Sequence, residues 1–208
     1  EIDIVSTNNS VYGYFAVSGG FELKKNFGSF STTVRASVGA NNGNKISKNQ
    51  NFFINDFGDN YINKSLKYIN SKIEYIRILK GTNFDYFFEQ SIKELISKEF
   101  IVSKLSDRMG MRLQGPIIKN LKETNIRSEG LTKGVIQVPA DGNPIIMLSD
   151  HGTIGGYPKI GAVISADYDR LVQTPSRKKI KFKLIELKEA EKLYKLYQME
   201  TENLLNQI

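Results

Sequence analysis

Hydrophobic residues recur at helical spacing in two segments of the chain. In residues 84–100 the apolar side chains fall on one helical face, and Thr82 with Asp85 three positions later is a capping pattern. In residues 187–205 the apolar positions again follow a helical period, with Glu and Lys between them. The spacing predicts two amphipathic helices, one internal and one at the end of the chain.

Short apolar runs bounded by glycine, proline or polar residues are the main feature of residues 101–185. They include residues 135–138, 145–148 and 160–164. Runs of this length between turn-forming residues are typical of strands. This part of the chain is therefore predicted to be a compact β-rich unit, and the pattern alone leaves barrel and sandwich both open.

The first third of the chain is more polar. Residues 11–17 indicate one strand, and residues 24–43, rich in Gly, Ser, Thr and Asn, predict a loop-dominated region. Residues 49–70 carry little periodicity, which fits a linker, an ordered connection or a variable region. The predicted fold class is mainly β with a few α-helices.

The formal charge of +7 permits anionic partners, but the basic residues do not form a nucleic-acid-binding pattern. Lys179, Lys181 and Lys183 alternate with apolar residues, as in a strand with one solvated face. A nucleic-acid-binding segment would instead interleave a basic run with exposed aromatic residues. The sequence therefore predicts no nucleic-acid partner.

The amino-acid composition excludes several kinds of chemistry. Without cysteine there is no disulfide or thiolate nucleophile, and a single histidine leaves little scope for a histidine metal centre or a Ser-His triad. No stretch approaches the roughly 18 to 20 apolar residues of a membrane span, and the opening residues lack a signal-peptide pattern. We expect a cytoplasmic protein with no membrane partner and no metal-ligand motif.

Three clusters combine glycine with hydroxyl or charged side chains. The first, residues 28–35, contains Ser29, Thr32 and Arg35. Backbone amides at a glycine turn, hydroxyls and a guanidinium are the parts of an anion- or carboxylate-binding site. The alternative is a turn whose hydroxyls bond to their own backbone.

The second cluster is residues 106–116. In an extended conformation it points Arg108 and Arg112 to one face, where two guanidinium groups could bind a carboxylate or a phosphate. The alternative is that Asp107 and a neighbouring acid pair with these arginines as structural salt bridges.

The third cluster is the densest in residues suited to catalysis. Asp150 follows an apolar run and is expected at a strand end, where side chains commonly project into a loop-built site. Lys159 could neutralise developing phosphoryl charge, and His151 is either a proton-transfer group or an ordinary packed or surface histidine. The other candidates are hydrogen-bond donors, or glycines that let a substrate approach the backbone: Gln137, Thr153, Gly155, Gly156 and Tyr157. No Walker A or Rossmann glycine pattern is present.

In this order and spacing the motifs resemble the allophanate hydrolase subunit 2 family, also described as biotin-dependent carboxylase-like. The matching strings are A-V-S-G-G at residues 16–20, G-S-F-S-T at 28–32, S-D-R-M-G-M-R-L-Q-G-P at 106–116, S-E-G-L-x-x-G-x-I-Q-V-P at 128–139, D-G-N-P-I at 141–145 and G-G-Y-P-K-I at 155–160. The family includes the C subunit of bacterial ATP-dependent 5-oxoprolinase, the KipA proteins and part of the carboxyltransferase region of urea carboxylase.

The resemblance implies a fold of cyclophilin-like β-barrel domains. It predicts that residues 1–80 are the remainder of an N-terminal β domain and that residues 81–208 form a C-terminal barrel domain with a terminal helix. Family members carry a further glycine-rich section before the segment matching residues 16–20, so the chain is expected to be N-terminally incomplete. Gly152 and Ile154 stand where the family pattern has Gln and Thr.

The resemblance also implies a function, the ATP-dependent opening of 5-oxo-L-proline to L-glutamate by an amide hydrolase that is active only with partner subunits. The implied partners are the B subunit, or a KipI-like protein, and a protein like the A subunit. ATP, with Mg²⁺, would be bound by this chain or by a partner.

In that reaction the lactam oxygen is phosphorylated before water opens the ring. Arg108 or Arg112 would hold the substrate carboxylate. Lys159, with the amides of Gly155 and Gly156, would stabilise the phosphoryl group, and Asp150 would transfer a proton or orient a metal-bound nucleotide.

Two other functions stay open within the resemblance. One is a carboxyltransferase that moves a carboxyl group from carboxybiotin to urea or an amide; this chain contains no biotin carboxylase or biotin carrier segment. The other is a KipA-like regulatory protein that binds a KipI-like partner with little catalysis of its own.

Overall fold

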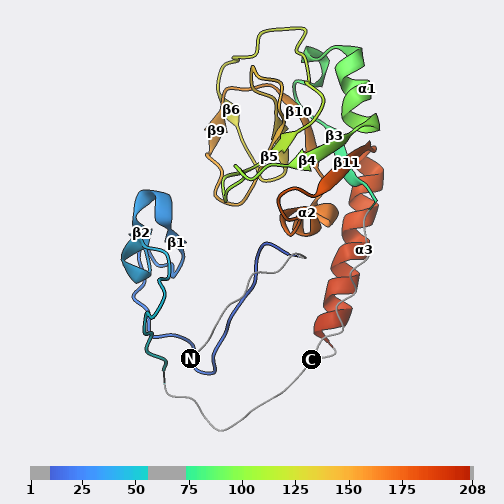
Figure 1. Cartoon of the computed structure of the whole chain (residues 1–208). Helices are drawn as coiled ribbons and strands as arrows, with labels where there is room; N and C mark the ends of the chain where they lie inside the picture. Colours follow the sequence, from blue (N-terminus) through green and yellow to red (C-terminus); the bar gives the residue numbers. More distant parts are fainter. Residues whose placement is uncertain (1–9, 56–73, 207–208) are drawn as a thin grey trace. The chain divides into compact units, whose positions relative to one another are not determined.

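The computed structural model describes residues 10–55 and 74–206 (Figure 1). These residues fall into two compact units, one made of residues 10–12 with 74–206 and the other of residues 13–55. The larger unit carries most of the regular structure, and the smaller one is built mainly from turns.

The larger unit is organised around a closed barrel of seven strands. In chain order the strands are β3 (Ile76–Lys80), β4 (Glu99–Val102), β5 (Gly110–Gln114), β7 (Val135–Gln137), β8 (Ile145–Met147), β10 (Lys159–Val163) and β11 (Lys179–Leu184). Around the barrel the order is β10-β3-β11-β4-β5-β8-β7, and the pairing of β10 with β7 closes it. Only β3 and β11 run parallel. The prediction of a mainly β protein with a barrel is confirmed.

Alternation along the strands fills the barrel with apolar side chains. In β11, Ile180 and Phe182 are buried while Lys179 and Lys183 are exposed, because successive strand residues face opposite sides. The predicted solvated lysine face is therefore confirmed. The core contributed by the strands includes Ile78, Phe100, Leu113, Ile136, Ile146, Ile160 and Phe182, each at most 1% exposed.

Strand β3 lies before residue 81, the predicted start of the barrel domain. It pairs with β10 on one side and with β11 on the other. The barrel therefore contains residues from both sides of that position. The alternation in Ile76, Arg77 and Ile78 is short and follows the aperiodic Asn-rich stretch, so no strand was predicted there.

Three α-helices accompany the barrel in the described residues: α1 (Glu89–Ser97), α2 (Ser165–Val172) and α3 (Leu187–Leu205). Figure 1 shows α1 and α3 on the side of the barrel that β11 occupies. Helix α3 has the predicted bounds, and its Ala190 packs with Ile164, Ala166 and Ile185 in a small second core. None of the described helices is long and apolar enough to cross a membrane.

The internal helix is shorter than predicted. Residues Phe84–Tyr86 form a 3₁₀ turn, α1 begins only at Glu89 without a side-chain cap, and Phe100 belongs to β4. The expected cap at Thr82 is wrong. Phe87 forms a β-bridge with Asn120, and the N–H of Phe88 donates to the carbonyl oxygen of Lys119 at 3.4 Å, so the chain stays extended at these two residues. Tertiary pairing thus overrides the helical period.

The smaller unit confirms the loop-dominated prediction for residues 24–43. It contains β1 (Thr32–Thr33), η1 (Val34–Ala36), β2 (Val38–Gly39) and η2 (Asn41–Gly43). The strand predicted at residues 11–17 is wrong: Val11 and Tyr12 instead donate their N–H groups to Oε1 of Gln173, at 3.0 and 2.8 Å. Much of the aperiodic stretch 49–70 lies outside the described residues.

Candidate functional site

Lys159 and Gln137 lie at one end of the barrel wall. Lys159 is the first residue of β10 and pairs with Gln137, the last residue of β7. Gln137 also faces Ile145, the first residue of β8. Both polar side chains belong to buried residues, each 4% exposed, so both need polar partners.

Lys159 finds its partner on a separate two-stranded ribbon. Its side chain is 5% exposed, and Nζ forms an ion pair with Oε2 of Glu129, whose side chain is 43% exposed. Glu129 belongs to β6 (Glu129–Gly130), which pairs with β9 (Ile154–Gly155). In Figure 1 this ribbon lies on the side of the barrel away from α1 and α3. A buried ammonium and a half-exposed carboxylate therefore meet where the ribbon covers the barrel.

Hydrogen bonds hold the Glu129 carboxylate in its ionised form. The bond from Lys159 is the main reason that the pKa of Glu129 lies below its usual range, and bonds from Asn83 and Thr82 act in the same direction. Glu129 is thus an acceptor-only group at neutral pH.

Asn83 fixes the backbone of Lys159. Its Oδ1 accepts the N–H of Lys159 at 3.0 Å, and its own N–H donates to the Lys159 carbonyl oxygen at 3.2 Å. A Cβ at Gly81, the residue after β3, would lie 2.2 Å from that same carbonyl oxygen, so only glycine fits at this position. Lys159 is consequently held from both its side chain and its backbone.

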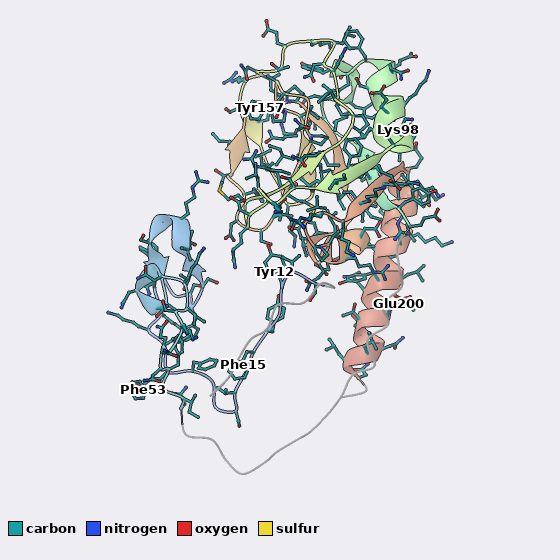
Figure 2. All side chains as sticks on the ribbon, viewed as in Figure 1. Tyr12, Phe15, Phe53, Lys98, Tyr157 and Glu200 are labelled. Carbon is teal, nitrogen blue, oxygen red and sulfur yellow. The ribbon has the colours of Figure 1, made fainter. Side chains whose placement is uncertain are left out.

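Gly155 lets the ribbon lie directly on Gln137. A Cβ at Gly155 would come within 2.8 Å of the Gln137 Nε2 atom, which donates to the carbonyl oxygen of Tyr157 at 3.1 Å. The Gly156 carbonyl accepts an N–H from residue 126 at 2.8 Å, and Figure 2 shows the half-exposed Tyr157 on the ribbon side of the barrel. The structure therefore brings together Gln137, Gly155, Gly156, Tyr157 and Lys159. Thr153, just before β9, is exposed, and its carbonyl oxygen accepts the N–H of residue 131.

Arg108 and Asp150 lie at the other end of the same wall and bind one another. Arg108 precedes β5 and Asp150 follows β8, at the end where Gly110 pairs with Met147. The Arg108 Nε is 2.6 Å from Oδ2 of Asp150, and Nη2 is 3.1 Å from Oδ1. The structure therefore does not bring Lys159 together with Arg108 and Asp150. Sequence proximity of Asp150 to Lys159 is misleading, because the intervening chain runs from one end of the wall to the other.

Arg112 does not join Arg108 in a shared anion site. Arg112 lies inside β5, exposed between the buried Met111 and Leu113. The guanidinium group of Arg108 is instead bound to the carboxylate of Asp150. The salt-bridge interpretation therefore fits Arg108, although the acid is Asp150. Asp107 instead accepts the backbone N–H groups of residues 109 and 110.

Two further predicted features have local roles in the structure. Nδ1 of His151 lies 2.6 Å from the carbonyl oxygen of the next residue. In the smaller unit, Oγ of Ser29 accepts the N–H of residue 31 at 3.0 Å, and Oγ1 of Thr32 donates to the carbonyl of residue 40 at 2.8 Å. These hydroxyls bond to nearby backbone, as in the turn alternative. Arg35 is exposed in η1.

Glu129, Asn83 and Thr82 are the residues that sequence reasoning missed. Glu129 stands in the S-E-G-L string, so the signal was present, but an acid between Ser and Gly suggests no role by itself. Asn83 is 76 positions from Lys159, and no local pattern connects them. Across residues 10–55 and 74–206, no three acidic or histidine side chains converge in a way that could hold a metal ion.

The pairing of Glu129 with Lys159 predicts a pH-dependent contribution to stability. A carboxyl whose folded-state pKa is lowered stabilises the fold above its ordinary pKa, and this contribution is lost as pH falls through the folded value. Urea unfolding should therefore show a gap between wild type and Glu129→Gln that is full at pH 7 and closes on acidification below about pH 4.5. A gap that stays constant from pH 7 to pH 3 would contradict the pairing.

Comparison with known proteins places this geometry in a family. The chain matches the family model "Carboxyltransferase domain, subdomain A and B" over residues 1–184. It is 33% identical over 184 residues to the 5-oxoprolinase C subunit of Haemophilus influenzae, covering 88% of this chain and 59% of that protein. It is 34% identical over 181 residues to the 5-oxoprolinase C subunit of Escherichia coli, covering 85% of this chain and 57% of that protein.

A solved structure agrees with the fold. The K. lactis urea amidolyase superposes with a TM-score of 0.78 at 21% identity, covering 91% of this chain and 13% of that one. The present chain spans less than two thirds of the length of the two 5-oxoprolinase subunits. Helix α3 lies beyond the residues that the family model matches.

Proposed function

The chain belongs to the carboxyltransferase domain family, subdomains A and B, and from this premise we propose that it acts as the C subunit of an ATP-dependent 5-oxoprolinase. The observation that carries the proposal is the similarity to two 5-oxoprolinase C subunits, at 33% and 34% identity over most of the chain. Such a protein works within an assembly, so we expect the B subunit, or a KipI-like protein, and a protein like the A subunit as partners.

The reaction joins two hydrolyses. The γ-phosphoryl group of ATP moves to the lactam oxygen of 5-oxoproline and leaves ADP. One water then adds to the ring carbon, the C–N bond breaks, and the nitrogen takes a proton to become the amine, which leaves an acyl phosphate of glutamate. A second water hydrolyses this acyl phosphate to the glutamate carboxylate and free phosphate. The protein's task is to position the lactam and to stabilise the charge that develops on its oxygen.

The Lys159 end of the barrel is suited to that task. An ammonium held in a nearly buried position interacts more strongly with a developing negative charge than one in water. The bonds from Asn83 and the pairing with Gln137 fix its backbone. Arg108 and Asp150 lie at the other end of the barrel wall, away from Lys159, so neither of them is assigned a role at the Lys159 site.

In the proposed reaction ATP is the co-substrate, and Mg²⁺ is the counter-ion of ATP. The described part of the chain shows no convergent acidic or histidine side chains for a metal ion. No step of the reaction is assigned to a metal bound by this chain, and the nucleotide is assigned to the assembly as a whole.

The choice of substrate tests the proposal against a carboxyltransferase function, which the family's description makes the second candidate. The assembly containing the full-length protein is supplied with ATP and 5-oxoproline, or with ATP, bicarbonate, biotin carrier protein and urea. The expected product is glutamate, formed with one ADP released. Carboxylated urea without glutamate would replace the proposed function with the carboxyltransferase.

A further inference from the structure

Lys159 and Glu129 present a hydrogen-bond donor and a hydrogen-bond acceptor side by side. The lysine ammonium carries three N–H donors and no acceptor, and an ionised carboxylate carries only acceptors. Their ion pair sets the two groups in direct contact. The order of the groups is fixed, because Lys159 is nearly buried and Glu129 forms the exposed part of the pair.

Both groups retain hydrogen-bonding capacity. One ammonium N–H is directed to Glu129, and the Lys159 backbone is bonded by Asn83 without use of the ammonium. The Glu129 carboxylate has about four lone-pair positions, and the hydrogen bond from Lys159 uses one of them. With 43% of its side chain exposed, Glu129 can accept one more donor from a ligand.

The surrounding chain keeps the pair in register. Glu129 faces Gly155 across the β6–β9 ribbon, and Gly155 rests on Gln137, which in turn pairs with Lys159. Glu129 and Lys159 are therefore connected by their ion pair and also by contacts through Gly155 and Gln137. Such support makes the spacing of the two groups a fixed feature that a ligand can match.

We infer that this pair binds the N–H and C=O edge of a cis amide, with Glu129 accepting the amide N–H and Lys159 donating to the amide oxygen. In a lactam ring the N–H and the C=O lie on the same edge, so one donor and one acceptor side by side are its complement. Urea and primary amides offer the same edge, whereas ordinary trans peptides do not. The inference deepens the proposed function and rests on it for the identity of the lactam.

Methylation of the amide nitrogen removes the group that Glu129 is assigned to bind. A site built to hydrogen-bond a substrate N–H rejects an analogue that lacks it, because a buried polar group is left unpaired. Glu129 is half-exposed, so water can replace part of the lost bond and the discrimination should be moderate, about 10- to 100-fold.

Binding of 5-oxoproline and of N-methyl-5-oxoproline is the measurement, made by calorimetry on the full-length protein in its assembly. Wild type should bind the parent lactam about 10- to 100-fold more tightly than the methylated one. Glu129→Gln should lose this preference and bind both with affinities within about threefold, because its amide can turn either a donor or an acceptor to the ligand. The matched control is Glu99→Gln, an exposed acid paired with Lys179 on β4 and β11, which should keep the wild-type preference.

Binding and turnover separate this inference from the proposed function. Lactam binding with the N-methyl preference but without glutamate formation would overturn the 5-oxoprolinase proposal and leave the amide-edge assignment standing. If glutamate forms but Glu129→Gln still prefers 5-oxoproline over the N-methyl lactam, the amide-edge assignment is overturned and the 5-oxoprolinase proposal stands. Equal affinities in wild type, or no lactam binding at all, would overturn the assignment of the pair.

Discussion

Replacing Arg77 by Met is expected to lower the free energy of unfolding by about 3 to 5 kcal/mol, because it leaves a buried carboxylate without its cation. Asp167, in the first turn of α2, has a side chain that is 0% exposed. It accepts the backbone N–H and the Nε–H of Arg77, each at 2.8 Å, and an Nη2–H of the same residue. The bond to Asp167 is also the main reason that the pKa of Arg77 is raised.

Urea unfolding checks this expectation, and the matched control is Lys122→Met. Lys122 pairs with Asp85 at 2.9 Å, but both side chains are largely exposed, so its loss should leave stability close to wild type. The double variant Arg77→Met with Asp167→Leu should recover part of the loss, since it removes the buried charge itself. A single variant Arg77→Met as stable as Lys122→Met would show that the pair does not hold α2 to β3.

Replacing Lys159 by Met is expected to reduce glutamate formation by about 100- to 1,000-fold in the complete assembly, the cost of removing one preorganised donor from an oxyanion site. Methionine fills the space of the lysine stem but supplies no charge. Because Glu129 is 43% exposed, water can solvate it once the ammonium is gone, and the fold should survive.

The control for this second prediction is Lys183→Met. Lys183 is an exposed residue of β11, on the outer face of the barrel, and its loss should leave turnover unchanged. Thermal melts of both variants separate loss of activity from loss of fold. Lys159→Met turning over at the wild-type rate with an intact melt would remove Lys159 from the reaction.

The strands and the terminal helix were predictable where one period dominates. Buried strands β7, β8 and β10 are short apolar runs between turn residues, and α3 keeps its helical spacing along its full length. Residues 84–100 also have a helical period, but Phe87 forms a bridge with Asn120, and Phe100 belongs to β4 and is buried in the core. A local period cannot reveal such long-range demands.

The candidate site was predictable only in part. Lys159, Gln137 and Gly155 stand in dense motifs, and the structure brings them together. Asp150 stands nine positions before Lys159, yet strand direction places it at the other end of the wall, beside Arg108. Asn83 had no signal, because its bond to Lys159 joins segments that are distant in the sequence.

The role of this chain in 5-oxoprolinase activity is tested by the rate at which glutamate forms from 5-oxoproline and ATP, measured with the partner subunits in the presence and in the absence of the full-length protein. ATP-coupled glutamate formation should fall to background when this protein is omitted and return when it is added back. Glutamate formation at an unchanged rate without it would contradict the claim that this chain is a working part of a 5-oxoprolinase.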